Sequence, residues 1–217
     1  MYERYSGGSV RHGARAPWLV ARLGGAALLA IVSLSCAAHA TTEEATAPIR
    51  QFYDVLLSNM QNSSTLGPKG RYDRLEPVIQ RDFDLTYMTR VAVGPPWLSL
   101  SDSERQQVTT AFGRYIAATY ASRFDGYSGE RLEVIGEQKI KRGTMVQSRI
   151  VKSDGEPVAI NYMVHDNAVG YQVRDVYVTG TISELATKCS EFATIMRTNG
   201  IDGLIASLNK KADDLRG

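Results

Sequence analysis

Residues 157–180 constrain the fold of this chain more than any other stretch, because two β-type runs there flank the turn-like sequence HDNAVG. Apolar and aromatic residues recur at every second position, which is typical of strands with one buried face. That face is expected to carry Val158, Ile160, Tyr162 and Val164 in the first run, and Tyr171, Val173, Asp175 and Tyr177 in the second. The pattern predicts an antiparallel hairpin. Since a lone hairpin is marginally stable in water, the rest of the chain must cover its apolar face.

Helical periodicity lies on both sides of this hairpin in the sequence. Amphipathic helical patterns fill about residues 45–125 and return over about 183–211. Between them, short turns separate strand-like runs at 131–138, 144–152, 157–165 and 171–179. This order predicts an α+β fold, in which helices from both ends of the chain cover a curved antiparallel four-stranded meander. Two such layers can close completely or leave a pocket between them.

Several helix boundaries carry recognisable signals. Asp84 is placed to cap the N-terminus of a short helix. Ser101 and Glu104 have the spacing of a capping box at the start of the longest helix. Near the C-terminus, Asn199-Gly200 predicts a helix end, and a charged tail is expected from Lys210.

The first 40 residues predict a cleaved secretory signal peptide, which leaves residues 41–217 as a single domain. Arginines precede an apolar run at residues 23–34, and Ala38-His39-Ala40 fits the small-x-small cleavage rule. The run is too short to be a permanent membrane span. Two alternatives stay open, namely lipidation of Cys36 and an uncleaved anchor. Cleavage would leave Cys189 as the only cysteine, so an internal disulfide is not expected.

The charge of the predicted mature domain is close to neutral. The chain has a formal net charge of +2, but residues 1–40 hold four arginines against one glutamate. The remaining 21 basic and 22 acidic side chains nearly balance. Such a balanced composition does not predict the basic surface that nucleic-acid binding requires, so no nucleic-acid partner is expected.

Motifs for catalysis or metal binding are scarce. His165 and Cys189 are not at metal-ligand spacing, and no nucleophile elbow or phosphate-binding glycine loop occurs, so we expect no metal, no cofactor and no catalytic residue. Asp175 is the one polar residue on a predicted apolar strand face. A buried carboxylate must be paired or hydrogen-bonded. Asp175 is either a structural acceptor for arginine or backbone N–H groups, with a bulge that places it at the sheet rim, or a general base at a cavity floor. The structural role is favoured, because no second titratable group accompanies Asp175 in the sequence.

The apolar faces are more informative than the polar motifs. Their residues form either a filled core or the wall of a cavity for an apolar ligand. Strand alternation places four candidate lining residues toward the helices, although a one-residue bulge would reverse such an assignment. The candidates for lipid binding on the strands are Val158, Ile160, Tyr162 and Val173, and those on the helices are Phe52, Leu56, Met88, Phe112, Ile116 and Tyr120.

The order of several short motifs resembles the MlaC-type periplasmic lipid-binding proteins, the toluene-tolerance family. The stretch from Arg81 to Gly94, with Trp97, is similar to the family signature FDF…MAR.ALG..W. The resemblance covers about residues 41–211. Further matches are Leu100 to Arg105, Ala111-Phe112, Thr119-Tyr120, Tyr162, Asp175-Val176, Phe192 and Gly200 to Ile205.

Some positions depart from the common family pattern. Residues 180–187 and 190–192 replace the usual GVSLV.NYRSQF, and Asn161 replaces an acidic residue before Tyr162. These departures are similar to the hopanoid-associated branch called HpnM. They favour a polycyclic triterpenoid ligand beside the phospholipid that the wider family suggests.

The resemblance implies a periplasmic lipid carrier with an apolar pocket between sheet and helices. Such a protein would enclose the apolar part of a hopanoid or phospholipid, and would shuttle it between the envelope membranes as a monomer. Its expected partners are an inner-membrane lipid transporter and possibly an outer-membrane component. Two other functions stay open: an isomerase- or hydratase-like enzyme that uses Asp175 on a cone-shaped α+β fold, and an envelope adaptor that binds no ligand.

Overall fold

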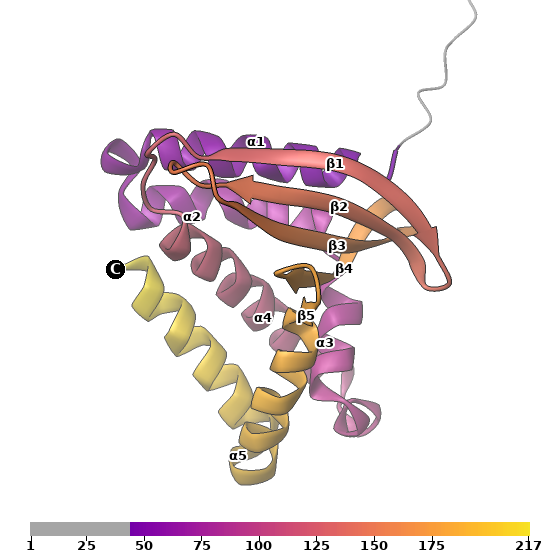
Figure 1. The fold of residues 1–217 in the computed structure, drawn as a ribbon. Coiled ribbons are helices and arrows are strands. Elements are labelled where there is room, and N and C mark those ends of the chain that lie inside the picture. Colours follow the sequence, from indigo (N-terminus) through magenta and orange to yellow (C-terminus); the bar gives the residue numbers. More distant parts are fainter. Residues whose placement is uncertain (1–43) are drawn as a thin grey trace, which may run out of the picture. The chain divides into compact units, whose positions relative to one another are not determined.

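The structure, a computed structural model, describes residues 44–217, so the predicted signal peptide and Cys36 lie outside the described residues. Helices precede and follow an antiparallel sheet, which makes the fold α+β as the sequence predicts (Figure 1). The elements are α1 (Ala47–Gln61), α2 (Ser63–Asp82), α3 (Leu85–Val93), the 3₁₀ helix η1 (Pro95–Ser99), α4 (Asp102–Arg123), β1 (Arg131–Ile140), β2 (Gly143–Val151), β3 (Pro157–Asn167), β4 (Gly170–Val178), β5 (Ile182–Ser183) and α5 (Glu184–Arg216).

The sheet has five antiparallel strands in the order β1-β2-β3-β4-β5, so the prediction of four strands is wrong by one. The additional strand forms because the backbone reverses at Thr179 and Gly180, whose φ angles are 52° and 80°. After this reversal, Ile182 and Ser183 pair with the end of β4. The short strand β5 thereby brings the first turn of α5 to the edge of the sheet.

A bulge in β4 corrects the predicted alternation of its side chains. Met163 pairs with Asp175, whereas the next β3 residue, Val164, pairs with Val173. Arg174 is therefore an extra residue, and it reverses the faces of everything after it. As a result, Val176 and Val178 lie on the same face as Val173, and Asp175 and Tyr177 lie on the opposite one.

The bulged residue Arg174 is held by α3. Its Nε donates to Asp84 Oδ2 at 2.9 Å, and its guanidinium carbon lies 4.4 Å from the centre of the Tyr87 ring. The same region joins strand and helix through the backbone, because Asp84 N donates to Val173 O at 2.9 Å. The ion pair and the cation–π contact stabilise the bulge that sets which β4 residues face the helices.

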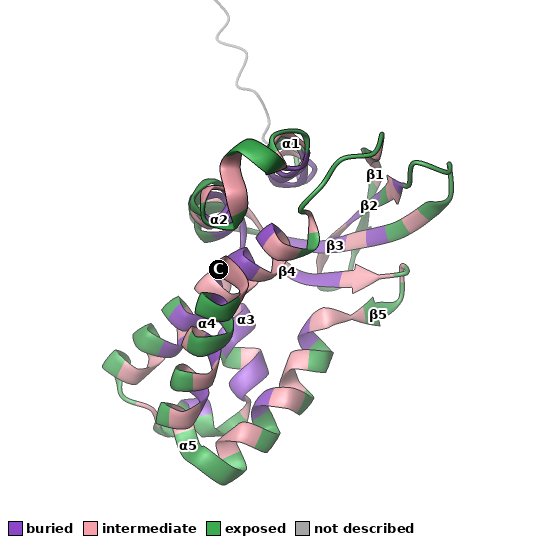
Figure 2. Ribbon diagram, turned by 90° about the vertical axis from the view of Figure 1, so that its left-hand side faces the viewer, coloured by how far each residue is buried: buried purple, intermediate pink, exposed green. Residues whose placement is uncertain are grey.

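The helices cover one face of the sheet in two parts. Figure 1 shows α1 running along the sheet, while the first half of α5 descends from the sheet edge and its second half returns beside α4. Buried residues lie on the surfaces that the helices and strands turn toward each other (Figure 2). No helix within residues 44–217 is long and apolar enough to cross a membrane.

The predicted helix boundaries at Asp84, Ser101 and Gly200 are confirmed. The Asp84 carboxylate accepts from Tyr87 N at 3.0 Å. Ser101 and Glu104 form the complete capping box, since Glu104 N donates to Ser101 Oγ and Ser101 N donates to Glu104 Oε2. Gly200 has a φ of 64° and divides α5 into two helical halves. Glycine adopts such a positive φ without steric strain, so it suits this kink.

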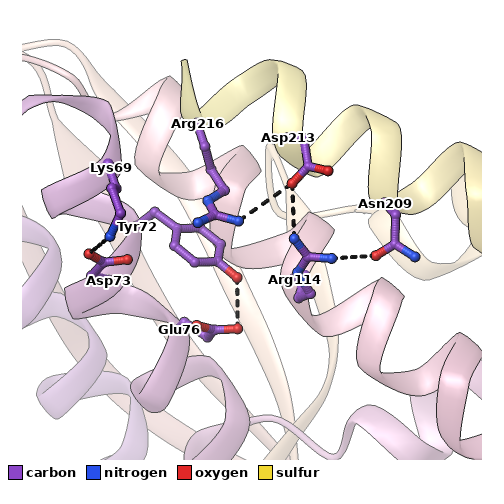
Figure 3. A network of polar contacts seen from close by, with 8 residues as sticks. All are labelled: Lys69, Tyr72, Asp73, Glu76, Arg114, Asn209, Asp213 and Arg216. Atoms are coloured by element: carbon purple, nitrogen blue, oxygen red, sulfur yellow. Dashed lines mark hydrogen bonds and ion pairs between the residues drawn. The ribbon is translucent and has the colours of Figure 1, made fainter.

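The sequence predicts a charged tail from Lys210, but α5 continues as a helix to Arg216, so this prediction is wrong. A network of polar contacts explains why the end of the chain is helical (Figure 3). Arg114 on α4 donates to Asn209 Oδ1 at 2.6 Å and to Asp213 Oδ1 at 2.9 Å. The Arg216 guanidinium carbon lies 4.2 Å from the centre of the Tyr72 ring on α2. The charges at the end of the chain thus have partners on two other helices, and these contacts support the last turns of α5.

Candidate functional site

An apolar cavity of about 220 Å³ lies between the sheet and the helices. Its wall draws on α1, α3, α4, α5 and three strands, so it exists only when both layers are assembled. The lining residues are Tyr53, Leu56, Phe83, Met88, Phe112, Tyr115, Ile116, Thr119, Tyr120, Arg123, Phe124, Ile150, Ile160, Tyr162, Val176, Val178, Glu184, Leu185 and Lys188.

A cluster of aromatic rings forms one part of the wall. Phe52 is at its centre, with ring centroids 4.9 Å from Tyr120, 5.6 Å from Phe83 and 6.5 Å from Tyr162. All three contacts are edge-to-face, the arrangement that aromatic quadrupoles favour. Phe52 is fully buried and lies behind the lining, whereas the three rings around it reach the cavity.

A short hydrogen-bond chain ties α1 to the sheet beside the cavity. The Tyr53 hydroxyl lies 2.7 Å from Ser148 Oγ on β2, and the Ser148 hydroxyl in turn donates to Ile160 O on β3. Since the only hydroxyl proton of Ser148 goes to Ile160 O, Tyr53 is the donor in the first bond. The chain satisfies polar groups that burial would otherwise leave unpaired.

The hydroxyls of Tyr53, Tyr120 and Tyr162 at this wall are neutral at physiological pH. Burial raises the pKa of Tyr120, and the neighbouring Tyr53 and Glu184 raise it further. Burial also raises the pKa of Tyr162 well above the ordinary value, with additional contributions from Tyr53 and Tyr120. For Tyr53, burial outweighs the opposing hydrogen bonds to Ser148 and Tyr162, so its pKa is raised as well. The inner wall therefore presents rings and neutral hydroxyls.

Three charged residues complete the lining, one at the end of α4 and two in the first turns of α5. Arg123 is exposed to solvent, while Glu184 and Lys188 are half-buried. A residue that both lines a cavity and contacts solvent marks where the cavity opens. The name "mouth" is used below for Arg123, Glu184 and Lys188 together.

Lys188 is protonated and held in place. Its Nζ donates to both carboxylate oxygens of Glu191, at 3.0 and 2.9 Å, and lies 3.5 Å from the Tyr115 hydroxyl. Burial lowers the pKa of Lys188, but Glu191 and Tyr115 together outweigh burial and leave the pKa raised. By contrast, the charged groups of Arg123 and Glu184 make no ion pair or hydrogen bond within residues 44–217.

Asp175 has a structural place in the fold. It is only 5% exposed and does not line the cavity, because the β4 bulge turns it to the opposite face. Its carboxylate accepts from Val176 N at 2.8 Å, Ser183 Oγ at 2.7 Å and Leu185 N at 3.1 Å. These bonds join β4 to the N-terminus of α5, which is the structural role that the sequence left open.

The structure brings seven of the ten candidate lipid-binding residues to the cavity. The three others do not line it: Phe52 and Val173 are buried in the core behind the wall, and Val158 is half-buried beside it. The seven that line the cavity are Leu56, Met88, Phe112, Ile116, Tyr120, Ile160 and Tyr162. That these seven residues contact a lipid remains a prediction.

Seven of the lining residues that the sequence did not indicate fall into three groups. Val176 and Val178 were missed because the bulge changes the alternation of β4. Tyr53 and Tyr115 lie on apolar helix faces that the periodicity does reveal, but nothing local distinguishes core from cavity wall. The mouth residues are charged, so a search for apolar faces passes over them.

Residues 44–217 give little support for a metal site or for a reactive thiol. Residues 44–217 contain no group of three or more His, Cys, Asp or Glu side chains that could hold a metal ion. Cys189 Sγ donates to Val91 O at 3.3 Å, and burial raises the pKa of this thiol. A raised pKa disfavours the thiolate, which is the reactive form of a cysteine.

Comparison with known proteins identifies relatives of this cavity-bearing fold. The family model described as "MlaC protein" matches residues 50–210. A solved structure of a phospholipid-binding protein from Ralstonia solanacearum, in complex with a phospholipid, superposes with a TM-score of 0.69. The two sequences are 20% identical, and the match covers 80% of this chain and 99% of the other. At this identity the likeness establishes the shared fold.

Proposed function

The chain belongs to the MlaC protein family, and from this premise we propose that it is a lipid carrier whose cavity encloses the apolar part of a membrane lipid. The single observation that carries the proposal is the apolar cavity between the sheet and the helices. The phospholipid in the related fold from Ralstonia solanacearum supports a ligand of this class.

The physical need for such a carrier follows from the hydrophobic effect. Exposing the tails of a lipid to water is unfavourable by roughly 25 cal/mol per Å² of apolar surface. A wall of Leu56, Met88, Phe112 and Ile160 replaces water with apolar contacts, and the neutral hydroxyls of Tyr120 and Tyr162 require no counterions. A carrier needs no catalytic group for this task.

The size of the cavity sets a condition on binding. Its volume of about 220 Å³ lies below the roughly 300–1,000 Å³ of pockets that enclose drug-sized ligands. We infer that binding of a whole tail requires the lining side chains to move apart. Met88 is suited to this, because its unbranched thioether adapts to different shapes.

The proposal includes two lipid classes, a phospholipid and a hopanoid. The phospholipid is supported by the ligand of the solved relative, and the hopanoid by the sequence departures at residues 180–187 and 190–192. We further propose that the protein works as a monomer in the periplasm, where it shuttles lipid between the envelope membranes. Its partners would be an inner-membrane lipid transporter and an outer-membrane component. The signal-like residues 1–40 support the location.

The two alternative functions fit the structure less well. An isomerase or hydratase that uses Asp175 would need this carboxylate in the cavity, whereas it is hydrogen-bonded to Ser183 and Leu185 outside the lining. An adaptor with a completely filled interior would need no cavity of this kind.

Native mass spectrometry of a detergent-free preparation tests the carrier proposal. We expect a protein mass increased by one lipid, and extraction followed by lipid mass spectrometry identifies the lipid class. Transfer of that lipid from donor to acceptor vesicles should accelerate when the purified protein is added. A protein that is free of lipid and does not accelerate transfer would refute the proposal.

A further inference from the structure

We propose that the mouth recognises a zwitterionic phospholipid headgroup, with Arg123 and Lys188 binding the phosphate and Glu184 binding the ammonium group. This inference rests on the proposed carrier function and adds the class of headgroup to it. It is carried by the three charged side chains that share the lining of an otherwise apolar cavity.

The spacing along α5 places one carboxylate and one ammonium on the same side of the helix. Glu184 and Lys188 are four residues apart, so they are neighbours about 6 Å apart along the helix axis. Such a pair often forms an ion pair, yet here the structure shows none between them, and Lys188 binds Glu191 instead. The Glu184 carboxylate is therefore available to a ligand at the opening.

Arg123 supplies the second positive charge, and it comes from α4 rather than from α5. It is the last residue of α4, and its guanidinium has no ion-pair partner within residues 44–217. Arg123 and Glu184 line the same cavity as Tyr120. The two charges thus belong to one opening although they come from different helices.

The chemistry of these groups selects the ligand. Guanidinium and ammonium groups are the usual partners of phosphate oxygens. A carboxylate in the same opening repels a headgroup that is only anionic, but it attracts one whose phosphate carries a short amine-bearing chain. Specificity often comes from such a combination of attraction and repulsion. Phosphatidylethanolamine meets these requirements, and phosphatidylglycerol does not.

A competition experiment tests the assignment. The purified protein, stripped of its lipid, is incubated with vesicles of equimolar phosphatidylethanolamine and phosphatidylglycerol that have identical acyl chains. The protein is then re-isolated, and the bound lipids are quantified by mass spectrometry. We expect about threefold enrichment of phosphatidylethanolamine, the size of a part-exposed ion-pair effect. Glu184→Gln should abolish the preference, and Glu184→Asp, which keeps the charge, should retain it.

Two further variants sharpen the test. Glu137→Gln removes the same charge from an exposed strand residue outside the cavity lining, so the preference should stay as in the wild type. Arg123→Gln should lower the uptake of both phospholipids about equally. Equal uptake of the two lipids by the wild type, or an unchanged ratio in Glu184→Gln, would overturn the inference and leave the carrier proposal standing. Uptake of neither lipid by the wild type would also overturn the headgroup assignment, whereas the carrier proposal is decided separately by the co-purification and transfer measurements described above.

Discussion

The hydroxyl oxygens of Tyr53 and Ser148 lie 2.7 Å apart and join α1 to β2 at the wall of the cavity. Both side chains are buried, and Ser148 extends the contact by donating to Ile160 O on β3. One helix and two strands are therefore held together by two hydroxyl groups. The contact fixes the distance between the layers where the cavity lies.

Removing the Tyr53 hydroxyl and removing the Ser148 hydroxyl should both destabilise the protein, but to different extents. Tyr53→Phe deletes the donor and should lower the free energy of unfolding by about 1 kcal/mol. Ser148→Ala removes both the acceptor of the Tyr53 hydroxyl and the donor to Ile160 O, so it should lower the free energy of unfolding by about 2 kcal/mol. Urea unfolding followed by circular dichroism measures both values. Three proteins of equal stability would show that the contact does not join the layers.

Filling the cavity should block lipid binding. Ile160 is 9% exposed and lines the cavity, so Ile160→Trp places an indole in the space that the lipid would occupy. We expect lipid per folded protein to fall at least about fivefold, with a stability loss of about 1–3 kcal/mol from overpacking. Ala159→Trp is the matched control, because Ala159 is the adjacent, exposed residue on the other face of β3. Unchanged lipid content in Ile160→Trp would refute the location of the site.

Substitutions of Asp175 should affect stability rather than chemistry. Asp175→Ala loses three hydrogen bonds to a buried carboxylate, so we expect the free energy of unfolding to fall by about 3 kcal/mol. Asp175→Asn should lose only about 1 kcal/mol. Its amide oxygen can still accept from Val176 N and Leu185 N, and its amide nitrogen can donate to Ser183 Oγ. Denaturant titration of both variants measures this order. A reversed order would contradict the structural role.

The buried tyrosines should make stability fall in alkaline solution. Burial, followed by the hydrogen bond to Glu76, raises the pKa of Tyr72 to about 12, whereas an unfolded tyrosine titrates near 10. Between these values the unfolded chain has lost a proton that the folded chain keeps, so each rise in pH favours unfolding. The stabilising difference is complete below about pH 10 and is lost as the pH approaches 12. Urea midpoints measured across this interval should decrease.

The tyrosine effect has a direct control. Tyr72→Phe should make the pH dependence shallower, while Tyr127→Phe, at an exposed position, should leave it unchanged. An equal slope in the wild type and in Tyr72→Phe would argue against a contribution from Tyr72.

The sequence by itself was sufficient for the local elements. Helical and strand periodicities, the Asp84 cap, the Ser101–Glu104 capping box and the kink at Gly200 all depend on residues within a few positions of each other. Side-chain capping and backbone conformational freedom act over one or two turns, so neighbouring residues determine them. The α+β class follows from the order of these elements.

Only the tertiary structure decided which residues face the cavity. The bulge at Arg174, whose side chain contacts Asp84 and Tyr87, moves Val176 and Val178 to the inner face and Asp175 away from it. The mouth likewise combines residues that are distant in the sequence, because Arg123 precedes strands β1 to β5 and Glu184 follows them. Periodicity assigns two faces to a strand. It does not record the long-range contacts that shift the register, or the packing that leaves one part of an apolar interface unfilled.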